Sequence, residues 1–167
     1  MTAPPSDERV DRYGPFAIWL TTNPLTTWLI RRVFSRLDPL VFRATHGRFS
    51  AMGPASGGML TLTTTGRRSG RPRSVQLGCV EHDGGWLVVA SAMGQEKHPA
   101  WRYNLDASPE VEVQMRGERF RARARVLSDA EKAAVWGKIL AEIPQIRVYE
   151  TRTDRNIRVF RLERAEG

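Results

Sequence analysis

This chain of 167 residues has little cysteine, no long apolar run and no secretory signal near its start. Its single cysteine, Cys79, excludes an internal disulfide and fits a reducing compartment; in an apolar stretch we expect it to be a small core residue. No uninterrupted run of about 18 apolar residues exists, so we expect no membrane span. Residues 1–15 lack the apolar stretch of a secretory leader, which predicts a cytoplasmic protein.

The sequence also lacks the patterns of most catalytic sites. Its three histidines (His46, His82 and His98) show no metal-ligand spacing with one another or with Cys79, so we expect no metal. No serine stands in a G-x-S-x-G motif, residues 66–70 lack the ending of a phosphate-binding P-loop, and no G-x-G-x-x-G follows a predicted strand. If the chain is an enzyme, we expect its chemistry to come from a bound cofactor.

Acidic residues are absent from position 39 to position 80, and this segment carries the strongest cationic motif of the chain. Four arginines fall within seven residues: Arg67, Arg68, Arg71 and Arg73. Guanidinium groups bind phosphate and carboxylate through paired hydrogen bonds, and no local carboxylate neutralises these four. Because the net charge is +8 and the pI is near 10.7, we expect an anionic partner: a nucleotide-like cofactor, nucleic acid or an acidic membrane surface.

Alternation of apolar and polar residues after position 59 predicts a β-rich body. We expect strands over residues 59–65, 74–82, 86–91, 111–115, 120–126 and 157–162. A short helix is expected from His98-Pro99, and a capping box at residues 128–131 begins a longer helix that Pro144 interrupts. Short antiparallel strands with two or three inserted helices indicate a small barrel of the mainly β or α+β class.

A further helix is expected before this body. Asn23-Pro24 has the form of an N-cap followed by a proline, and Asp38-Pro39 ends the helix. One face is apolar, and Arg31, Arg32 and Arg36 lie on the other. The helix either packs on the body or binds an anionic membrane surface through residues 24–37, which would place the protein at the inner face of the cell membrane. We therefore divide the chain into a tail and amphipathic helix, residues 1–38, and a barrel domain, residues 39–167.

A second row of arginines has a simpler explanation. Arg119, Arg121, Arg123 and Arg125 alternate with apolar residues between positions 120 and 126. This pattern predicts a half-buried strand with a solvated basic face and not a second binding site. Trp86 and Phe120 fall at core-facing positions, so the strands offer few platforms on which nucleic acid bases could stack, and we expect no nucleic acid partner.

Several motifs together resemble the deazaflavin-dependent nitroreductase family. They occupy residues 62–70, 72–73, 88–91, 94, 97–101, 104–105, 107, 109 and 111, and then 149, 153–155 and 157. The resemblance covers roughly residues 40 to 163 and implies a split β-barrel of the FMN-binding type. It also implies binding of the deazaflavin coenzyme F420, whose reduced form passes a hydride to quinones, enones or nitroaromatics.

The resemblance also implies where the coenzyme binds. Its phosphodiester and oligoglutamate tail are expected to contact Thr63, Arg67, Arg68, Ser69, Gly70, Arg71, Pro72 and Arg73. Its ring is expected to lie against Val89, Ala90, Ser91, Ala92, Met93, Ala100 and Trp101. For Trp101, core packing at a helix start is an equal alternative.

The expected acceptor site departs from the family. Residues 143–149 match a segment that carries substrate-facing tyrosines in a nitroreductase of the family; here Ile143 and Ile146 replace two of them and Tyr149 remains. These substitutions favour an apolar quinone or enone over a nitroimidazole. Ser91 and Tyr149 are the predicted catalytic residues, as hydrogen-bond donors to the acceptor. For Ser91, a bond to the backbone at a strand end is the alternative.

Two other functions remain open at this stage. One is a split barrel that binds FMN or F420 with little turnover. The other is a basic barrel that binds nucleic acid through residues 67–73. The oligomeric state does not follow from the sequence.

Overall fold

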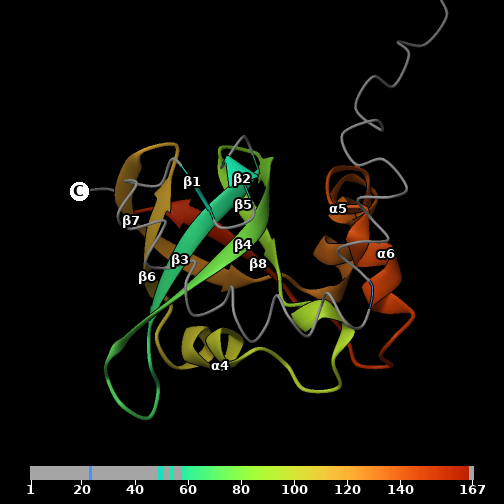
Figure 1. Ribbon diagram of the computed structural model, residues 1–167, viewed down its shortest axis with the longest axis horizontal. Coiled ribbons are helices and arrows are strands. Elements are labelled where there is room, and N and C mark those ends of the chain that lie inside the picture. Colours follow the sequence, from blue (N-terminus) through green and yellow to red (C-terminus); the bar gives the residue numbers. More distant parts are fainter. Residues whose placement is uncertain (1–22, 24–48, 51–52, 55–57, 166–167) are drawn as a thin grey trace, which may run out of the picture.

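The computed structural model describes residues 58–165 continuously, together with Asn23 and two short paired strands, β1 (Phe49–Ser50) and β2 (Gly53–Pro54) (Figure 1). The expected N-terminal helix, over residues 24–37, lies outside the described residues. No helix in the described part of the chain is long and apolar enough to cross a membrane.

Six antiparallel strands close into a barrel, which confirms the predicted fold class. The strands are β3 (Met59–Thr65), β4 (Pro72–His82), β5 (Gly85–Val89), β6 (Glu110–Met115), β7 (Glu118–Val126) and β8 (Val159–Arg164). Their order around the barrel is β3-β4-β5-β8-β7-β6, so the last strand of the chain lies between β5 and β7.

Two tight turns fix the register of the hairpins in this barrel. Asp83 and Gly84 have φ of 46° and 74°, and they join β4 to β5 where His82 pairs with Gly85. Arg116 and Gly117, with φ of 50° and 81°, join β6 to β7 in the same way. Positive φ at both central residues is the geometry of the type I′ turn, whose twist matches that of paired strands.

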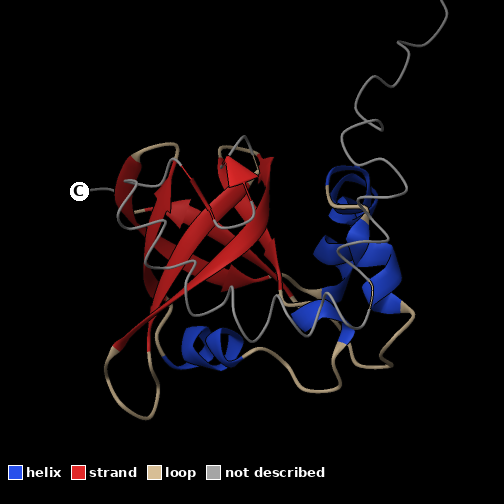
Figure 2. Cartoon of the chain, in the orientation of Figure 1, coloured by secondary structure: helices blue, strands red, loops and turns tan. Residues whose placement is uncertain are grey.

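Four helical segments are inserted between the strands: η3 (Ala92–Gly94), α4 (Ala100–Ala107), α5 (Asp129–Glu142) and α6 (Gln145–Glu150). Figure 2 shows α4 across one end of the barrel and α5 and α6 together on one side. The sequence did not predict α6, because Pro144 was taken to end the preceding helix. Pro144 in fact stands at the N-cap of α6, where the absence of an N–H group costs nothing.

The barrel encloses one hydrophobic core, and the helices enclose another outside it. The interior core includes Leu60, Leu62, Val88, Val113 and Leu162. Successive side chains of β4 alternate between the two cores, so that Cys79 packs in the interior core and Val80 in the outer one. The outer core joins β4, β5 and β8 to α5 and α6 through Val80, Leu87, Val89, Leu127, Val135, Ile139, Ile146, Tyr149, Ile157 and Val159.

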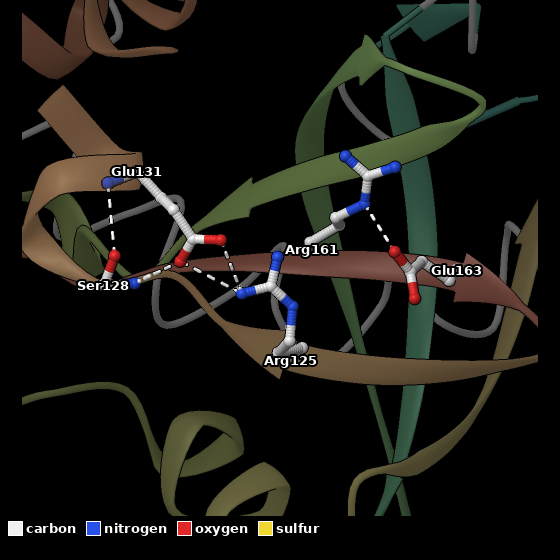
Figure 3. A network of polar contacts seen from close by, with 5 residues as sticks. All are labelled: Arg125, Ser128, Glu131, Arg161 and Glu163. Atoms are coloured by element: carbon white, nitrogen blue, oxygen red, sulfur yellow. Dashed lines mark hydrogen bonds and ion pairs between the residues drawn. The ribbon is translucent and has the colours of Figure 1, made fainter. Parts of the chain in front are cut away.

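The capping box predicted for α5 is present. Ser128 Oγ accepts a hydrogen bond from Glu131 N, and Ser128 N donates to Glu131 Oε2 at 2.8 Å. Figure 3 shows that Arg125 on β7 reaches the same carboxylate, with Nη1 2.8 Å from Oε1. The neighbouring Arg161 on β8 pairs with Glu163 at 2.7 Å. Each of the two arginines, which face each other across the strand pair, therefore has its own carboxylate.

The arginine row on β7 is a solvated face, as the sequence predicts. Arg119 and Arg123 form ion pairs with Glu112 and Glu110 on the adjacent β6, both at 3.5 Å. All these side chains are largely exposed. Exposed pairs of this kind add little to stability, but they leave the row with little free charge.

Candidate functional site

Segments from three parts of the barrel domain lie along one end of the barrel. They are the β3–β4 loop with its arginines, helix α4, and η3 together with α6. Figure 1 shows α4 between the loop and η3. The residues implied for the coenzyme tail and most of those implied for its ring therefore lie on opposite sides of one short helix, and the other two, Ala100 and Trp101, belong to the helix itself.

The arginine loop is held in shape by its own backbone. Gly66 N donates to Arg71 O at 2.9 Å, and Gly70 N donates to Gly66 O at 2.7 Å. Gly70 has a φ of 63°, a conformation that favours glycine. A Cβ on Gly66 would lie 2.8 Å from Ser69 Oγ and 3.0 Å from Arg71 O, so a larger residue there would displace Ser69 and crowd the loop backbone.

Asn104 of α4 anchors this loop to the barrel. Its side chain is 6% exposed, donates Nδ2–H to Thr64 Oγ1 at 2.9 Å, and accepts from Arg67 N at 3.1 Å. A buried amide with both partners in place is a rigid connection, because losing either bond leaves an unpaired polar group. The base of the loop is thus fixed relative to α4.

The loop arginines have no carboxylate partner in the part of the chain that the structure describes. Within the described residues, Arg68, Arg71 and Arg73 are exposed and form no ion pair, in contrast to the arginines of β7. Arg67 instead lies over the ring of Tyr103, with Cζ 5.0 Å from the ring centroid, and Arg102 approaches the same ring at 4.8 Å. These guanidinium groups are available to an external anion.

On the other side of α4, η3 has an unusual backbone. Ala92, Met93 and Gly94 all have positive φ, of 48°, 56° and 77°, after Ser91 in the right-handed helical region. A right-handed residue followed by a left-handed one turns successive N–H groups toward one point, which suits an anion or a polarised oxygen. Within the described part of the chain, the N–H groups of Ser91, Ala92 and Met93 have no acceptor.

Helix α6 packs directly on η3. A Cβ on Gly94 would lie 2.8 Å from Tyr149 O and 2.7 Å from Arg152 Cβ, so the contact leaves room only for glycine. The two predicted catalytic residues, Ser91 and Tyr149, therefore come from segments in contact. Burial raises the pKa of Tyr149, so its hydroxyl keeps its proton and can donate. Ser91 caps no backbone group with its hydroxyl, so the alternative of a backbone-bonded serine finds no support among the described residues.

Not all of the predicted site residues point to one place. Ala90 and Trp101 lie in the interior core, and the ring of Trp101 is 5.6 Å from that of Phe160, so core packing accounts for Trp101. Val89, Ile146 and Tyr149 are buried in the outer core, which leaves Ile143 and Met93 as the half-buried apolar residues of the predicted site. Ala100 is exposed at the start of α4.

Two further predicted tail contacts lie on the strands below the loop. Thr63 pairs with Ser74, Oγ1 to Oγ at 2.9 Å, on the outer face of β3 and β4. Pro72 begins β4 directly after Arg71. Both positions adjoin the loop arginines, and their contact with the coenzyme tail stays a prediction.

Sequence reasoning assigned no role to Asn104, Tyr103 or Arg155, although the structure places all three at this site. Arg155 donates to the carbonyls of Ala90, Ser91 and Gln95, and thus to the segment that carries η3. Asn104 and Arg155 stood among the residues that resembled the family, and that was the only signal the sequence gave.

Neither a reactive thiol nor a metal site is found among the described residues. Burial raises the pKa of Cys79 to about 12, so its thiol is protonated and inert inside the barrel. Among the described residues no group of His, Cys, Asp or Glu could hold a metal ion.

Comparison with known proteins identifies the family. Residues 34–164 match the family described as F420H(2)-dependent quinone reductase. An F420H(2)-dependent quinone reductase of Mycobacterium tuberculosis (strain H37Rv) is 33% identical over 147 residues, 84% of this chain and 98% of the relative. A second relative, a putative F420H(2)-dependent quinone reductase of Mycobacterium bovis, matches to the same extent, with 33% identity over 147 residues.

Solved structures agree with the sequence matches. An F420-H2 dependent reductase, FDR-A, superposes with a TM-score of 0.59 at 38% identity, covering 64% of this chain and 95% of that one. A protein solved as a domain-swapped dimer superposes with a TM-score of 0.61 at 32% identity, covering 83% of this chain and 99% of that one. On the family match, which spans most of the sequence, this chain belongs to the F420H(2)-dependent quinone reductases.

Proposed function

We propose that this chain binds coenzyme F420 along α4, with the anionic tail at the arginine loop and the ring at η3 and α6, and reduces quinones. As a member of the F420H(2)-dependent quinone reductases, the chain is an oxidoreductase, and its cofactor is F420. The observation that supports this binding mode is the presence of two kinds of free donor on the two sides of α4. On one side the loop arginines form no ion pair within the described residues, and on the other the N–H groups of Ser91, Ala92 and Met93 have no acceptor there.

The donor groups of this site fit the coenzyme. A phosphodiester and several carboxylates need cationic donors that are not already paired, and Arg68, Arg71 and Arg73 meet that need. The polar edge of a deazaflavin needs hydrogen-bond donors, which the N–H groups of Ser91, Ala92 and Met93 supply. The half-buried Ile143 and Met93 supply apolar surface close to these donors.

When bound in its reduced form, the coenzyme supplies the hydride. The chain contributes position and electrostatics. Ser91 Oγ and Tyr149 Oη donate hydrogen bonds to the oxygen of the acceptor on which negative charge develops. Tyr149, whose raised pKa keeps it protonated, can pass its proton to the reduced quinone oxygen, and the tyrosinate left behind then takes a proton from solvent. Ile143 makes the acceptor side apolar, and this favours quinones over polar nitroimidazoles.

Stopped-flow mixing of F420H2 and a menadione-like quinone with the purified protein tests this function. We expect reoxidation of the coenzyme much faster than in buffer, and faster with quinones than with nitroimidazoles. Reoxidation no faster than in buffer across a panel of quinones and enones would refute the reductase activity. Titration with F420 and FMN in parallel then shows which cofactor the protein binds, and binding without turnover would leave a carrier function.

We further propose that residues 39–167 form the cofactor-binding domain and that residues 24–37 contact an anionic membrane surface. The support for this contact is the sequence alone, in which Arg31, Arg32 and Arg36 lie opposite an apolar face. A membrane location would bring the site close to lipid-soluble quinones.

A further inference from the structure

The conformation of residues 92–94, among the predicted ring contacts, is not stabilised by hydrogen bonds within the segment alone. Three consecutive residues, 92–94, lie in the left-handed region, and two of them, Ala92 and Met93, carry a Cβ that disfavours it. The only internal bonds of this segment are Gly94 N to Ser91 O at 3.0 Å and Gln95 N to Ala92 O at 3.2 Å. Such a conformation persists only where neighbouring groups hold it in place.

Arg155, on the loop between α6 and β8, is the neighbour that does so. Its Nε donates to Gln95 O at 2.7 Å, its Nη1 donates to Ala90 O at 2.9 Å, and its Nη2 donates to Ser91 O. One planar guanidinium therefore bonds two carbonyls that precede the left-handed residues 92–94, those of Ala90 and Ser91, and one that follows them, that of Gln95. No carboxylate pairs with Arg155 among the described residues, so this guanidinium holds backbone and neutralises no charge.

We propose that Arg155 is a positioning residue, which holds residues 90–95 in the conformation that directs the N–H groups of Ser91, Ala92 and Met93 toward the coenzyme ring. This inference rests on the proposed function, since it assumes that the ring binds there. Arg155 itself touches neither coenzyme nor quinone. In a trans peptide the C=O group and the following N–H group point in opposite directions, so Arg155, by bonding Ala90 O and Ser91 O, lies on the side opposite to the N–H groups of Ser91 and Ala92.

His98 completes the contacts of Arg155 and makes them sensitive to pH. Nη1 of Arg155 lies 3.2 Å from His98 Nδ1, and because an arginine can only donate, His98 must accept and so must be neutral. Burial, and then the nearby Arg102, Arg155 and Arg158, lower the pKa of His98 from its ordinary 6.5, against a weaker opposing effect of Asp106. Tyr103 also faces the imidazole edge-on, at 6.1 Å between centroids.

Protonation of His98 would remove this acceptor and place a cation against Arg155. The positioning contact is therefore complete above the lowered pKa of His98 and weakens as the pH falls through it, at some value below 6.5. In the wild type we expect the rate of hydride transfer to fall over this acidic range.

The test compares Arg155→Gln and Arg155→Lys with Arg121→Gln. This control removes the same charge from an exposed position on β7 where no ion pair is formed with any described residue. Three measurements are made: amide hydrogen exchange of Gly94 and Gln95, the NMR titration of His98, and the single-turnover rate of F420H2 oxidation by a quinone. Thermal unfolding is recorded for each variant, so that a loss of fold is recognised.

For Arg155→Gln we expect amide exchange at Gly94 and Gln95 to rise by about tenfold or more, because the carbonyls lose their partner. The pKa of His98 should move up toward 6.5, because a neighbouring cation is gone. Hydride transfer should slow by about 10- to 100-fold and lose its fall at acidic pH. Arg155→Lys cannot reach all the carbonyls, so its amide exchange and its hydride-transfer rate should resemble those of Arg155→Gln. Because lysine keeps the positive charge, the pKa of His98 should stay lowered in this variant. Arg121→Gln should resemble the wild type.

Exchange at Gly94 and Gln95 that is unchanged in Arg155→Gln would overturn the proposal, as would full rescue of the rate by Arg155→Lys. The first two measurements need no coenzyme. They therefore test the positioning contact even if the chain fails to oxidise F420H2, and a failure of the proposed function is distinguishable from a failure of this inference.

Discussion

Arginine has three roles in this chain, and the partner of each guanidinium decides which. Arg123 on β7 pairs with Glu110 in solvent and has a structural role at most. Arg155 is half-buried, bonds backbone carbonyls and holds a loop. Arg68 is exposed and has no partner among the described residues, which leaves it available to a ligand. The residue type is the same in all three cases. The roles differ because each guanidinium has a different partner nearby: a carboxylate, backbone carbonyls, or neither among the described residues.

Substitution of the loop arginines should weaken coenzyme binding without unfolding the protein. Because Arg68 and Arg73 are exposed, solvent screens their interaction with the tail, and we expect each alanine variant to lower F420 affinity by about two- to fivefold. Fluorescence titration measures this. Arg121→Ala, with the same loss of charge on β7, is the control and should bind normally. Equal affinities for all variants would remove the loop from the site.

The two predicted hydrogen-bond donors should act on the rate and not on cofactor binding. We expect Ser91→Ala and Tyr149→Phe each to lower kcat by about 10- to 1,000-fold, because each removes a group that stabilises negative charge on the acceptor. F420 affinity should stay within about twofold of the wild type. Steady-state kinetics with a quinone and titration with F420 separate these effects. Full activity of both variants would exclude both residues from catalysis.

The part of the site that depends on sequence-local chemistry could be predicted, and the part that depends on long-range contacts could not. The arginine loop follows from four guanidinium groups in a segment without acidic residues. Asn104 bonds a residue 40 positions away, and Arg155 bonds one 65 positions away. A single sequence gives no indication of which residues meet across such separations, so their roles came only from the structure.

At the scale of elements, periodicity was a reliable guide where one face is buried. The alternation of apolar and polar residues predicted the ends of β6 and β7 to within two residues, because every second side chain of a half-buried strand faces the core. Helix α6 was missed because it has only six residues and its apolar side chains, Ile146 and Tyr149, are three apart, which is too short for a helical repeat to stand out. Proline at its N-cap concealed it further.

The bond between α4 and the arginine loop gives a prediction at this scale. We expect Asn104→Ala to reduce the free energy of unfolding by about 1–3 kcal/mol, because Thr64 Oγ1 and Arg67 N lose a buried partner. F420 affinity should also fall, since the loop is no longer fixed to α4. Urea unfolding and F420 titration measure the two effects. The control, Asn156→Ala, removes exposed bonds to Asp129 and Lys132 and should change neither quantity much.

The predicted amphipathic helix can be tested as an element on its own. We expect the full chain to float with anionic vesicles at low salt and to be released at high salt, because Arg31, Arg32 and Arg36 act through screened charge. Replacing these three by glutamine should abolish flotation, whereas replacing Arg119, Arg121 and Arg123 should not. Equal recovery of the full chain and the glutamine variant would refute membrane contact by residues 24–37.

At the scale of the whole molecule, the barrel could be predicted as a class but not as a topology. Short strands and I′ turns indicate antiparallel hairpins, such as the one around Asp83-Gly84. The place of β8 between β5 and β7 depends on contacts between strands far apart in the sequence. That insertion matters for the site, because it leads the loop with Arg155 back past residues 90–95 before the chain enters β8.

The net charge of the molecule predicts how binding responds to salt. The chain carries +8 overall, and within the described residues the carboxylates of β6 neutralise part of β7, whereas Arg68, Arg71 and Arg73 of the loop form no ion pair. We expect F420 affinity to fall by about tenfold or more between about 0.05 and 0.5 M salt, because exposed ion pairs are screened at short range. The deazaflavin riboside, which lacks the phosphate and the glutamates, is the matched ligand. Its binding through η3 alone should be weaker and nearly independent of salt. If both ligands responded to salt equally, the tail would not be bound by the arginines, and the orientation proposed along α4 would be wrong.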